Sequence, residues 1–221
     1  MSEAKIYPNV IIGPDAQLGE YVIIGFPPRG RVAGELPTLI GRGAVIRSHT
    51  VIYAGNRIGD HFQTGHGVLI REENQIGNSV SIGSGSIVEH HTLIEDGVRI
   101  HSQAFIPEFS HLEQECWLGP HVVLTNALHP LCPHAKQCLK GPVIGRRAKI
   151  GANVTILPDR RIGENALVGA GSVVVDDVPT GAVVAGNPAR VIKQIEELNC
   201  PYGLIDRPYE GRPGVSRDSE T

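Results

Sequence analysis

An aliphatic side chain returns at every sixth position along most of this chain. The register covers 12–24, resumes over 40–124 and returns over 144–174, and of its twenty-four positions Thr64 alone is not Ile, Val or Leu. Because six is a multiple of the two-residue strand period, every repeat turns its aliphatic side chain to the same side. An α-helix needs a period of 3.6 residues, so the pattern excludes helix over these stretches.

Glycine follows the aliphatic residue at twelve of these positions, as in Ile76-Gly77 and Leu118-Gly119. Glycine tolerates positive φ and tight corners, so each repeat is expected to be a short strand followed by a corner. One such unit cannot bury its own aliphatic side chain, whereas stacked coils bury a continuous column of them. The sequence therefore predicts an all-β fold, a parallel β-helix.

Two segments interrupt the repeat, near 26–39 and 126–143. The first is rich in glycine and proline, and the second contains two histidines and two cysteines. Such segments are expected to project as loops, and loops on a rigid scaffold often carry function. We expect residues 1–192 to form one β-helix domain, with a short helix from Lys193 to Leu198 and a tail completing the stretch 193–221.

The composition excludes several function classes. The 221 residues carry a formal net charge of −3, so the composition does not indicate the basic surface that nucleic-acid binding requires. No apolar run approaches the roughly 20 residues that a membrane span requires. The first residues lack the apolar segment of a signal peptide, so we expect a cytoplasmic protein. The four cysteines stand in no regular framework, which favours free thiols.

The [Ile/Val/Leu]-Gly-x-x-x-x pattern over roughly 10–192 resembles the left-handed β-helix, or hexapeptide-repeat, acyltransferases. The resemblance implies three hexads per triangular coil, stacking of residues 18 apart, about eight coils, and a homotrimer that uses acetyl-CoA, with coenzyme A bound between subunits. The left hand rests on the resemblance, because the general crossover rule favours the right.

The segment Ser86–Ile94 is similar to the one that carries the catalytic base in sugar and lipid acyltransferases of this fold. The match places His90 as general base, with His91 as the alternative. By the 18-residue stacking, Glu72, His90, Glu108 and Asn126 form one column, and a carboxylate beside His90 would orient its ring. A solvated or subunit-interface histidine remains the alternative interpretation.

The stretch Leu124–Pro130 is similar to nucleotide-sugar N-acetyltransferases, in which a Thr-Asn segment leads into a loop at the acceptor site. Asn126 could hold the acceptor through its amide, with Glu72 and His129 as further substrate contacts. An asparagine that supports the loop corner would look the same.

The resemblance also implies coenzyme A contacts. Backbone amides at Gly151, Ala152, Gly169 and Ala170 would bond the pantetheine arm, and the exit segment with Pro188 and Arg190 would meet a phosphate. Corner formation explains part of the glycine pattern without any cofactor.

These features favour an N-acetyltransferase acting on an amino sugar, one that is nucleotide-linked. The alternatives are an O-acetyltransferase on a sugar, a metalloenzyme resembling γ-class carbonic anhydrase that uses His61 and His66, and a non-catalytic scaffold. The carbonic anhydrase pattern fails at position 25, where Gly stands instead of histidine. The loop residues His129, Cys132, His134 and Cys138 match no zinc spacing, so we expect no metal.

Overall fold

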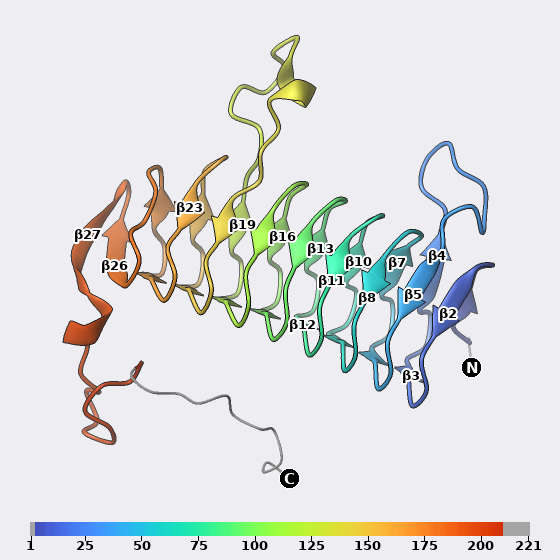
Figure 1. Cartoon of the computed structure of the whole chain (residues 1–221), viewed down its shortest axis with the longest axis horizontal. Coiled ribbons are helices and arrows are strands. Elements are labelled where there is room, and N and C mark those ends of the chain that lie inside the picture. Colours follow the sequence, from blue (N-terminus) through green and yellow to red (C-terminus); the bar gives the residue numbers. More distant parts are fainter. Residues whose placement is uncertain (1–2, 210–221) are drawn as a thin grey trace.

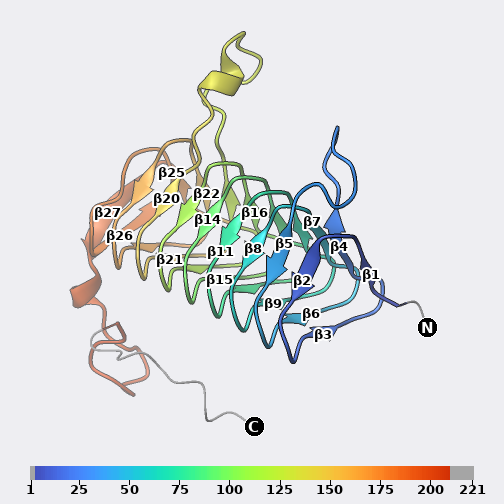
Figure 2. The same ribbon diagram turned by 45° about the vertical axis from the view of Figure 1, so that its right-hand side comes forward.

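The computed structural model describes residues 3–209, which form a prism of stacked triangular coils (Figures 1 and 2). Almost every strand is two or three residues long, and three hydrogen-bonded sheets make the three faces of the prism. The coils wind in a left-handed sense (Figure 2). This confirms the predicted left-handed parallel β-helix of about eight coils.

Each face collects every third strand of the chain. Face A is β1 (Lys5–Ile6), β4 (Ile23–Phe26), β7 (Val51–Tyr53), β10 (Leu69–Ile70), β13 (Ile87–Val88), β16 (Phe105–Ile106), β19 (Val123–Leu124), β22 (Thr155–Ile156) and β25 (Val173–Val174). Face B is β2 (Val10–Ile12), β5 (Thr38–Ile40), β8 (Arg57–Ile58), β11 (Gln75–Ile76), β14 (Leu93–Ile94), β17 (His111–Leu112), β20 (Val143–Ile144) and β23 (Arg161–Ile162).

Face C carries the remaining strands and closes the C-terminal end. It is β3 (Gln17–Leu18), β6 (Val45–Ile46), β9 (Gln63–Thr64), β12 (Ser81–Ile82), β15 (Arg99–Ile100), β18 (Trp117–Leu118), β21 (Lys149–Ile150), β24 (Leu167–Val168), β26 (Ala182–Gly186) and β27 (Ala189–Gln194).

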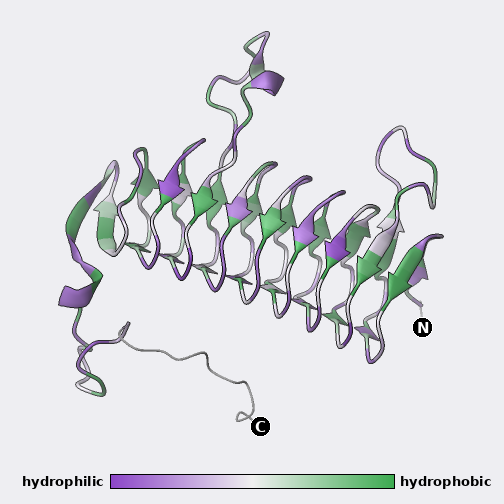
Figure 3. Cartoon of the chain, in the orientation of Figure 1, coloured by the Kyte–Doolittle hydropathy of each residue, from purple (hydrophilic) through white to green (hydrophobic). Residues whose placement is uncertain are grey.

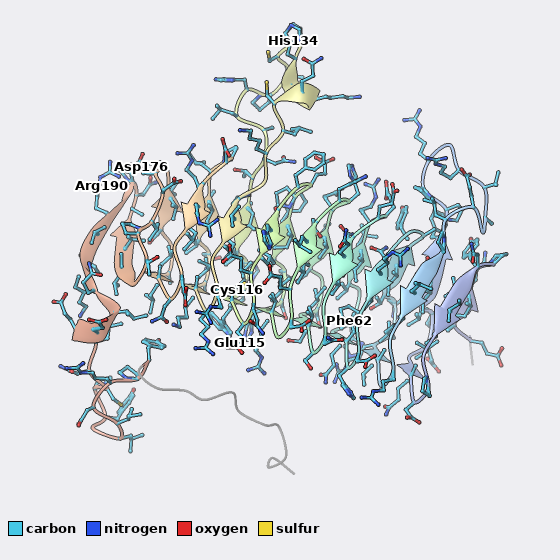
Figure 4. All side chains as sticks on the ribbon, viewed as in Figure 1. Phe62, Glu115, Cys116, His134, Asp176 and Arg190 are labelled. Atoms are coloured by element: carbon cyan, nitrogen blue, oxygen red, sulfur yellow. The ribbon has the colours of Figure 1, made fainter. Side chains whose placement is uncertain are left out.

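The repeat position points into the prism, as predicted. Val88 pairs in register with Ile70 and Ile106, each 18 residues away, and all three are fully buried. Phe62 and Cys116 join this core from the position two before the next repeat position, and Figure 4 marks both. Burial raises the pKa of the Cys116 thiol strongly. The interior is thus one aliphatic column per face, with side chains such as Val80, Ala104, Cys116 and Phe62 between the columns.

Thr64 occupies a core position without leaving a polar atom unpaired. Its Oγ1 accepts a hydrogen bond from the Arg47 N–H at 3.0 Å and lies 3.2 Å from the Thr50 hydroxyl. A buried hydroxyl costs free energy unless it is hydrogen-bonded, so these two contacts make the exception tolerable.

The two predicted loops are present and leave the coils intact. The first connects Phe26 to Thr38 and the second connects Leu124 to Val143. The strands that flank each loop still pair in parallel, Val10 with Thr38 and Val123 with Thr155. The insertions therefore leave from corners and do not change the stacking.

The C-terminal end differs from the prediction. Lys193 and Gln194 belong to β27, which pairs antiparallel with β26, and helical structure is limited to a 3-10 turn, η2 (Ile195–Glu197). The predicted helix from Lys193 to Leu198 was wrong because its first residues pair with Ala182 and Val183 of β26. Much of the predicted tail lies outside the described residues.

The connections between faces place some side chains in unusual backbone positions. Glu73, His91 and Phe109 follow face A strands with φ of 58°, 57° and 64°, in the left-handed region. Residues at such corners turn their side chains outward at the edge of the prism. Among residues 3–209, no helix is long and apolar enough to cross a membrane.

Candidate functional site

The edge between faces A and B carries both loops and the predicted catalytic column. Each loop follows a face A strand, β4 or β19, and leads to a face B strand, and Figures 1 and 2 show both loops projecting from the same side. Glu72, His90, Glu108 and Asn126 each stand two residues after a face A strand end. We call this line of corners the A/B edge.

His90, Glu108 and Asn126 come together as a hydrogen-bonded chain. The His90 Nε2 lies 2.9 Å from Glu108 Oε1, and the Asn126 amide donates to Glu108 Oε2 at 2.8 Å. The side chains of His90 and Glu108 are each about one quarter exposed, at 25% and 24%. Both carboxylate oxygens of Glu108 are therefore engaged, and the His90 ring is held in place.

Glu72 pairs with a different residue from the one expected. The Arg71 guanidinium grips it through two hydrogen bonds, of 2.8 and 2.9 Å, and reaches Glu89 at 3.1 Å. Partial burial raises the pKa of Glu72, but the hydrogen bonds from Arg71 and from its own backbone N–H, together with the charges of Arg71 and His90, outweigh it, and the pKa lies below the usual value. Glu72 in turn raises the pKa of Arg71. Arg71 was missed from the sequence, although it stands 18 residues before Glu89.

His91 sits directly beside His90. The two Nδ1 atoms are 2.7 Å apart, and the His91 side chain is 48% exposed. Its Nε2 is 3.6 Å from Glu73 Oε2, beyond hydrogen-bond length. The Phe109 ring packs near both imidazoles, with centroid distances of 6.3 Å to His90 and 6.0 Å to His91. Both histidine candidates therefore belong to one cluster.

Three aromatic rings continue the A/B edge toward the N-terminal coils. Tyr7, Phe26 and Tyr53 follow one another with centroid distances of 5.7 and 5.1 Å, and Arg71 caps Tyr53 at 5.2 Å. We call them the aromatic row. The sequence signal was available, since Tyr7 and Tyr53 each follow the repeat position of a face A strand and Phe26 ends β4 beside the first loop.

The projecting loop does not join this cluster within the chain. His129, Cys132 and Cys138 are exposed, and His134 lies at the far end of the loop (Figure 4). Over the described residues, one group of three side chains could share a metal ion, formed by Glu89, His90 and Glu108. His129 is thus separate from the other predicted substrate residues in this protomer.

The predicted coenzyme A glycines have a structural role. Gly151 and Gly169 donate their N–H groups to Val168 O and Val184 O at 2.8 Å, so these amides are not available to a ligand. A Cβ on Gly151 would lie 2.6 Å from the backbone nitrogen of Ala170. The close approach of stacked coils explains Gly151, and the N–H groups of Gly151 and Gly169 are both already bonded within the protein. Within residues 3–209, the N–H groups of Ala152 and Ala170 have no protein acceptor.

The exit segment forms the hairpin between β26 and β27. Pro188 lies in its turn, and Arg190 is exposed on β27, where its Nη1 is 3.3 Å from Asp176 Oδ2. Figure 4 shows this pair at the C-terminal end of the prism. A single exposed ion pair is weak, so the guanidinium remains available to another anion.

Residues 141–176 match the family model described as bacterial transferase hexapeptide (six repeats). The matched segment holds the last repeats of the six-residue pattern. Over 80 residues it is 45% identical to 2,3,4,5-tetrahydropyridine-2,6-dicarboxylate N-acetyltransferase of Clostridium perfringens, an alignment that covers 36% of this chain and 31% of the relative. The chain thus spans about a third of the length of the curated relatives it matches.

Solved structures that resemble this chain include PerB and LpxA. PerB from Caulobacter crescentus, in complex with CoA and GDP-perosamine, is 24% identical, with a TM-score of 0.34 over 63% of this chain and 57% of that chain. LpxA from Acinetobacter baumannii is 21% identical, with a TM-score of 0.47 over 88% of this chain and 73% of that chain.

Proposed function

We propose that this chain is an acetyltransferase that moves an acetyl group from acetyl-CoA to the amine of a nucleotide-linked amino sugar. The observation that carries the proposal is the oriented chain Asn126–Glu108–His90 at the A/B edge, with His91 beside it. The 45% identity over 80 residues to a named N-acetyltransferase supports the reaction class.

The chemistry requires little from the protein. The attacking amine must lose a proton, and the thioester oxygen must be stabilised as it becomes an oxyanion. Neutral histidine is the usual base near pH 7, and a hydrogen-bonded carboxylate holds its ring and stabilises the imidazolium. The pair His90–His91 with Glu108 supplies these groups at one corner.

The charge around the histidines favours an amine over a hydroxyl. Glu72, Glu73, Glu89 and Glu108 surround the pair, and Arg71 is the cation that contacts two of them. An excess of carboxylates attracts an ammonium group and gives no comparable advantage to a neutral hydroxyl. This supports N-acetylation over O-acetylation.

The remainder of the acceptor extends along the same edge. Coils repeat at about 4.8 Å, which puts the aromatic row roughly 10 Å or more from His90. A heteroaromatic ring stacks well on half-exposed aromatic side chains. An acceptor with an amine at one end and a base at the other fits this layout, which supports a nucleotide-linked sugar.

Acetyl-CoA is proposed to bind along the later coils. The available N–H groups of Ala152 and Ala170 would bond the pantetheine arm, and Arg190 on the β26–β27 hairpin would meet a phosphate. Pro188 shapes the turn beside it.

A homotrimer is proposed to complete the site. The outward positions of face A form an apolar, partly exposed row of the kind that marks an interface. Face B, by contrast, mixes hydrophilic and hydrophobic strands (Figure 3). The row is Ile23, Val51, Leu69, Ile87, Phe105, Val123 and Val173, and Lys5 and Thr155 occupy the remaining outward positions of face A. Burial of face A against another copy would place the A/B edge beside a subunit boundary.

The test is a panel of free and nucleotide-linked amino sugars, each paired with its hydroxyl counterpart, incubated with acetyl-CoA while thiol release is followed. We expect release that depends on the amine and is fastest with nucleotide-linked acceptors. Coenzyme A alone should raise the melting temperature, because a ligand of the folded state stabilises it. Absence of both effects would refute the proposal, and release with hydroxyl acceptors alone would identify an O-acetyltransferase.

A further inference from the structure

The contact between His90 and His91 determines which ring nitrogen is free to act. Glu108, as a carboxylate, only accepts hydrogen bonds, so the His90 Nε2 that lies 2.9 Å from it must carry the hydrogen. In a neutral ring the His90 Nδ1 then has a lone pair. The 2.7 Å contact between the two Nδ1 atoms therefore requires that His91 Nδ1–H donates to His90.

This arrangement leaves His91 Nε2 with the free lone pair. Both nitrogens of His90 are occupied, by Glu108 on one side and His91 on the other. His91 is also the more exposed of the two, with 48% of its side chain exposed against 25% for His90. The nitrogen that can meet an acceptor thus belongs to His91.

We propose that His91 is the group that takes the proton from the acceptor, and that His90 is a positioning residue that relays charge to Glu108. The inference rests on the proposed acetyl transfer. The groups that face His91 are Glu73, His90 and Phe109. Glu73, at 3.6 Å, is too distant to occupy Nε2 by a hydrogen bond and close enough to attract an ammonium group.

The proton path balances in both directions. As the acceptor nitrogen bonds to the thioester carbon, its proton passes to His91 Nε2, and the hydrogen on His91 Nδ1 crosses the 2.7 Å contact to His90 Nδ1. The positive charge then lies on His90, next to the Glu108 carboxylate. When the carbon–sulfur bond breaks, the thiolate takes the proton from His91 Nε2 and the hydrogen on His90 Nδ1 returns. The products are the amide and the free thiol.

The kinetic test compares His91→Gln with His90→Gln, and uses His121→Gln as the control. His121 is another exposed histidine with positive φ, at 58°, and it stands after a face C strand away from the A/B edge. We expect kcat to fall about 10²–10⁴-fold in His91→Gln, the usual contribution of a positioned base. His90→Gln should lose about tenfold, and His121→Gln should be unchanged. Near-normal turnover in His91→Gln together with a loss of more than about 10² in His90→Gln would overturn the relay.

A second measurement does not depend on turnover. Two-bond ¹H–¹⁵N spectra of the wild-type protein should show the hydrogen on Nδ1 of His91 and on Nε2 of His90, and His90→Gln should release His91 from its Nδ1–H form. The opposite tautomers would contradict the relay even in an active enzyme. If the spectra fit and no amine is acetylated, the proposed function fails and the hydrogen-bond assignment stands.

Discussion

Arg71 shows how single residues build the A/B edge. It holds Glu72 and Glu89 from neighbouring coils and covers the face of Tyr53, so one guanidinium connects the carboxylate cluster to the aromatic row. Arginine suits this position because its planar fork grips a carboxylate through two hydrogen bonds and still stacks on a ring. The acidic residues beside the histidines are thereby fixed in place.

The Arg71–Glu72 pair predicts a pH dependence of stability. Because the folded-state pKa of Glu72 lies below its usual value, the pair stabilises the fold above the unfolded-state pKa of about 4.3. That contribution is lost as the pH falls through the lower, folded-state pKa. Glu72→Gln should therefore melt below the wild type at pH 7, and the difference should shrink below about pH 4. A difference in melting temperature that is constant from pH 7 to pH 3 would contradict this origin.

Among the elements, the corners restrict residue choice more tightly than the strands do. Gly151 sits where the next coil passes, and an added Cβ would lie 2.6 Å from Ala170 N. Gly67 has a positive φ of 64°, and a Cβ added to it would have no atom within 4 Å. Substitution of Gly151 thus tests steric crowding between coils, and substitution of Gly67 tests backbone conformation alone.

Gly151→Ala should cost about 3 kcal/mol, because the stacked coils must move apart, as in overpacked cores. Gly67→Ala should cost about 1 kcal/mol, the strain of a left-handed residue with a Cβ. Urea unfolding of both variants at one protein concentration provides the comparison. An equal loss of unfolding free energy in the two variants would show that neighbouring coils move apart at little cost.

At the scale of the whole molecule, the prism presents two different outer surfaces. Ile87 lies at the middle of the apolar row on face A, whereas Gln75 is exposed on face B. Burial of face A between copies would remove its apolar row from water, which is the dominant favourable term in association.

If the proposed trimer forms through face A, Ile87→Glu should yield monomers and abolish acetyl transfer, since the A/B edge borders face A. Light scattering at micromolar concentration measures the assembly, and circular dichroism should show the coils still folded. Gln75→Glu adds the same charge to face B and should leave both assembly and activity unchanged. A wild-type monomer, or a trimer that survives Ile87→Glu, would exclude face A as the interface.

The six-residue repeat by itself predicted an all-β fold, a parallel β-helix. The left hand and the 18-residue stacking came from the resemblance to hexapeptide-repeat acyltransferases, and that stacking predicted His90, Glu108 and Asn126 in one column, where the structure places them. Both loops were visible as breaks in the same period. These features are periodic, and periodicity is a property of the sequence.

The tertiary structure decided what periodicity does not encode. Arg71 captures Glu72, the next coil occupies the N–H groups of Gly151 and Gly169, and β26 pairs with the segment that had been expected to be helical. The proposed direction of the hydrogen bond between His90 and His91 also depends on which neighbour each ring nitrogen meets, with Glu108 at His90 Nε2. Each of these outcomes depends on competition among neighbours in space for the same donors and acceptors, and the sequence lists those groups without saying which of them meet.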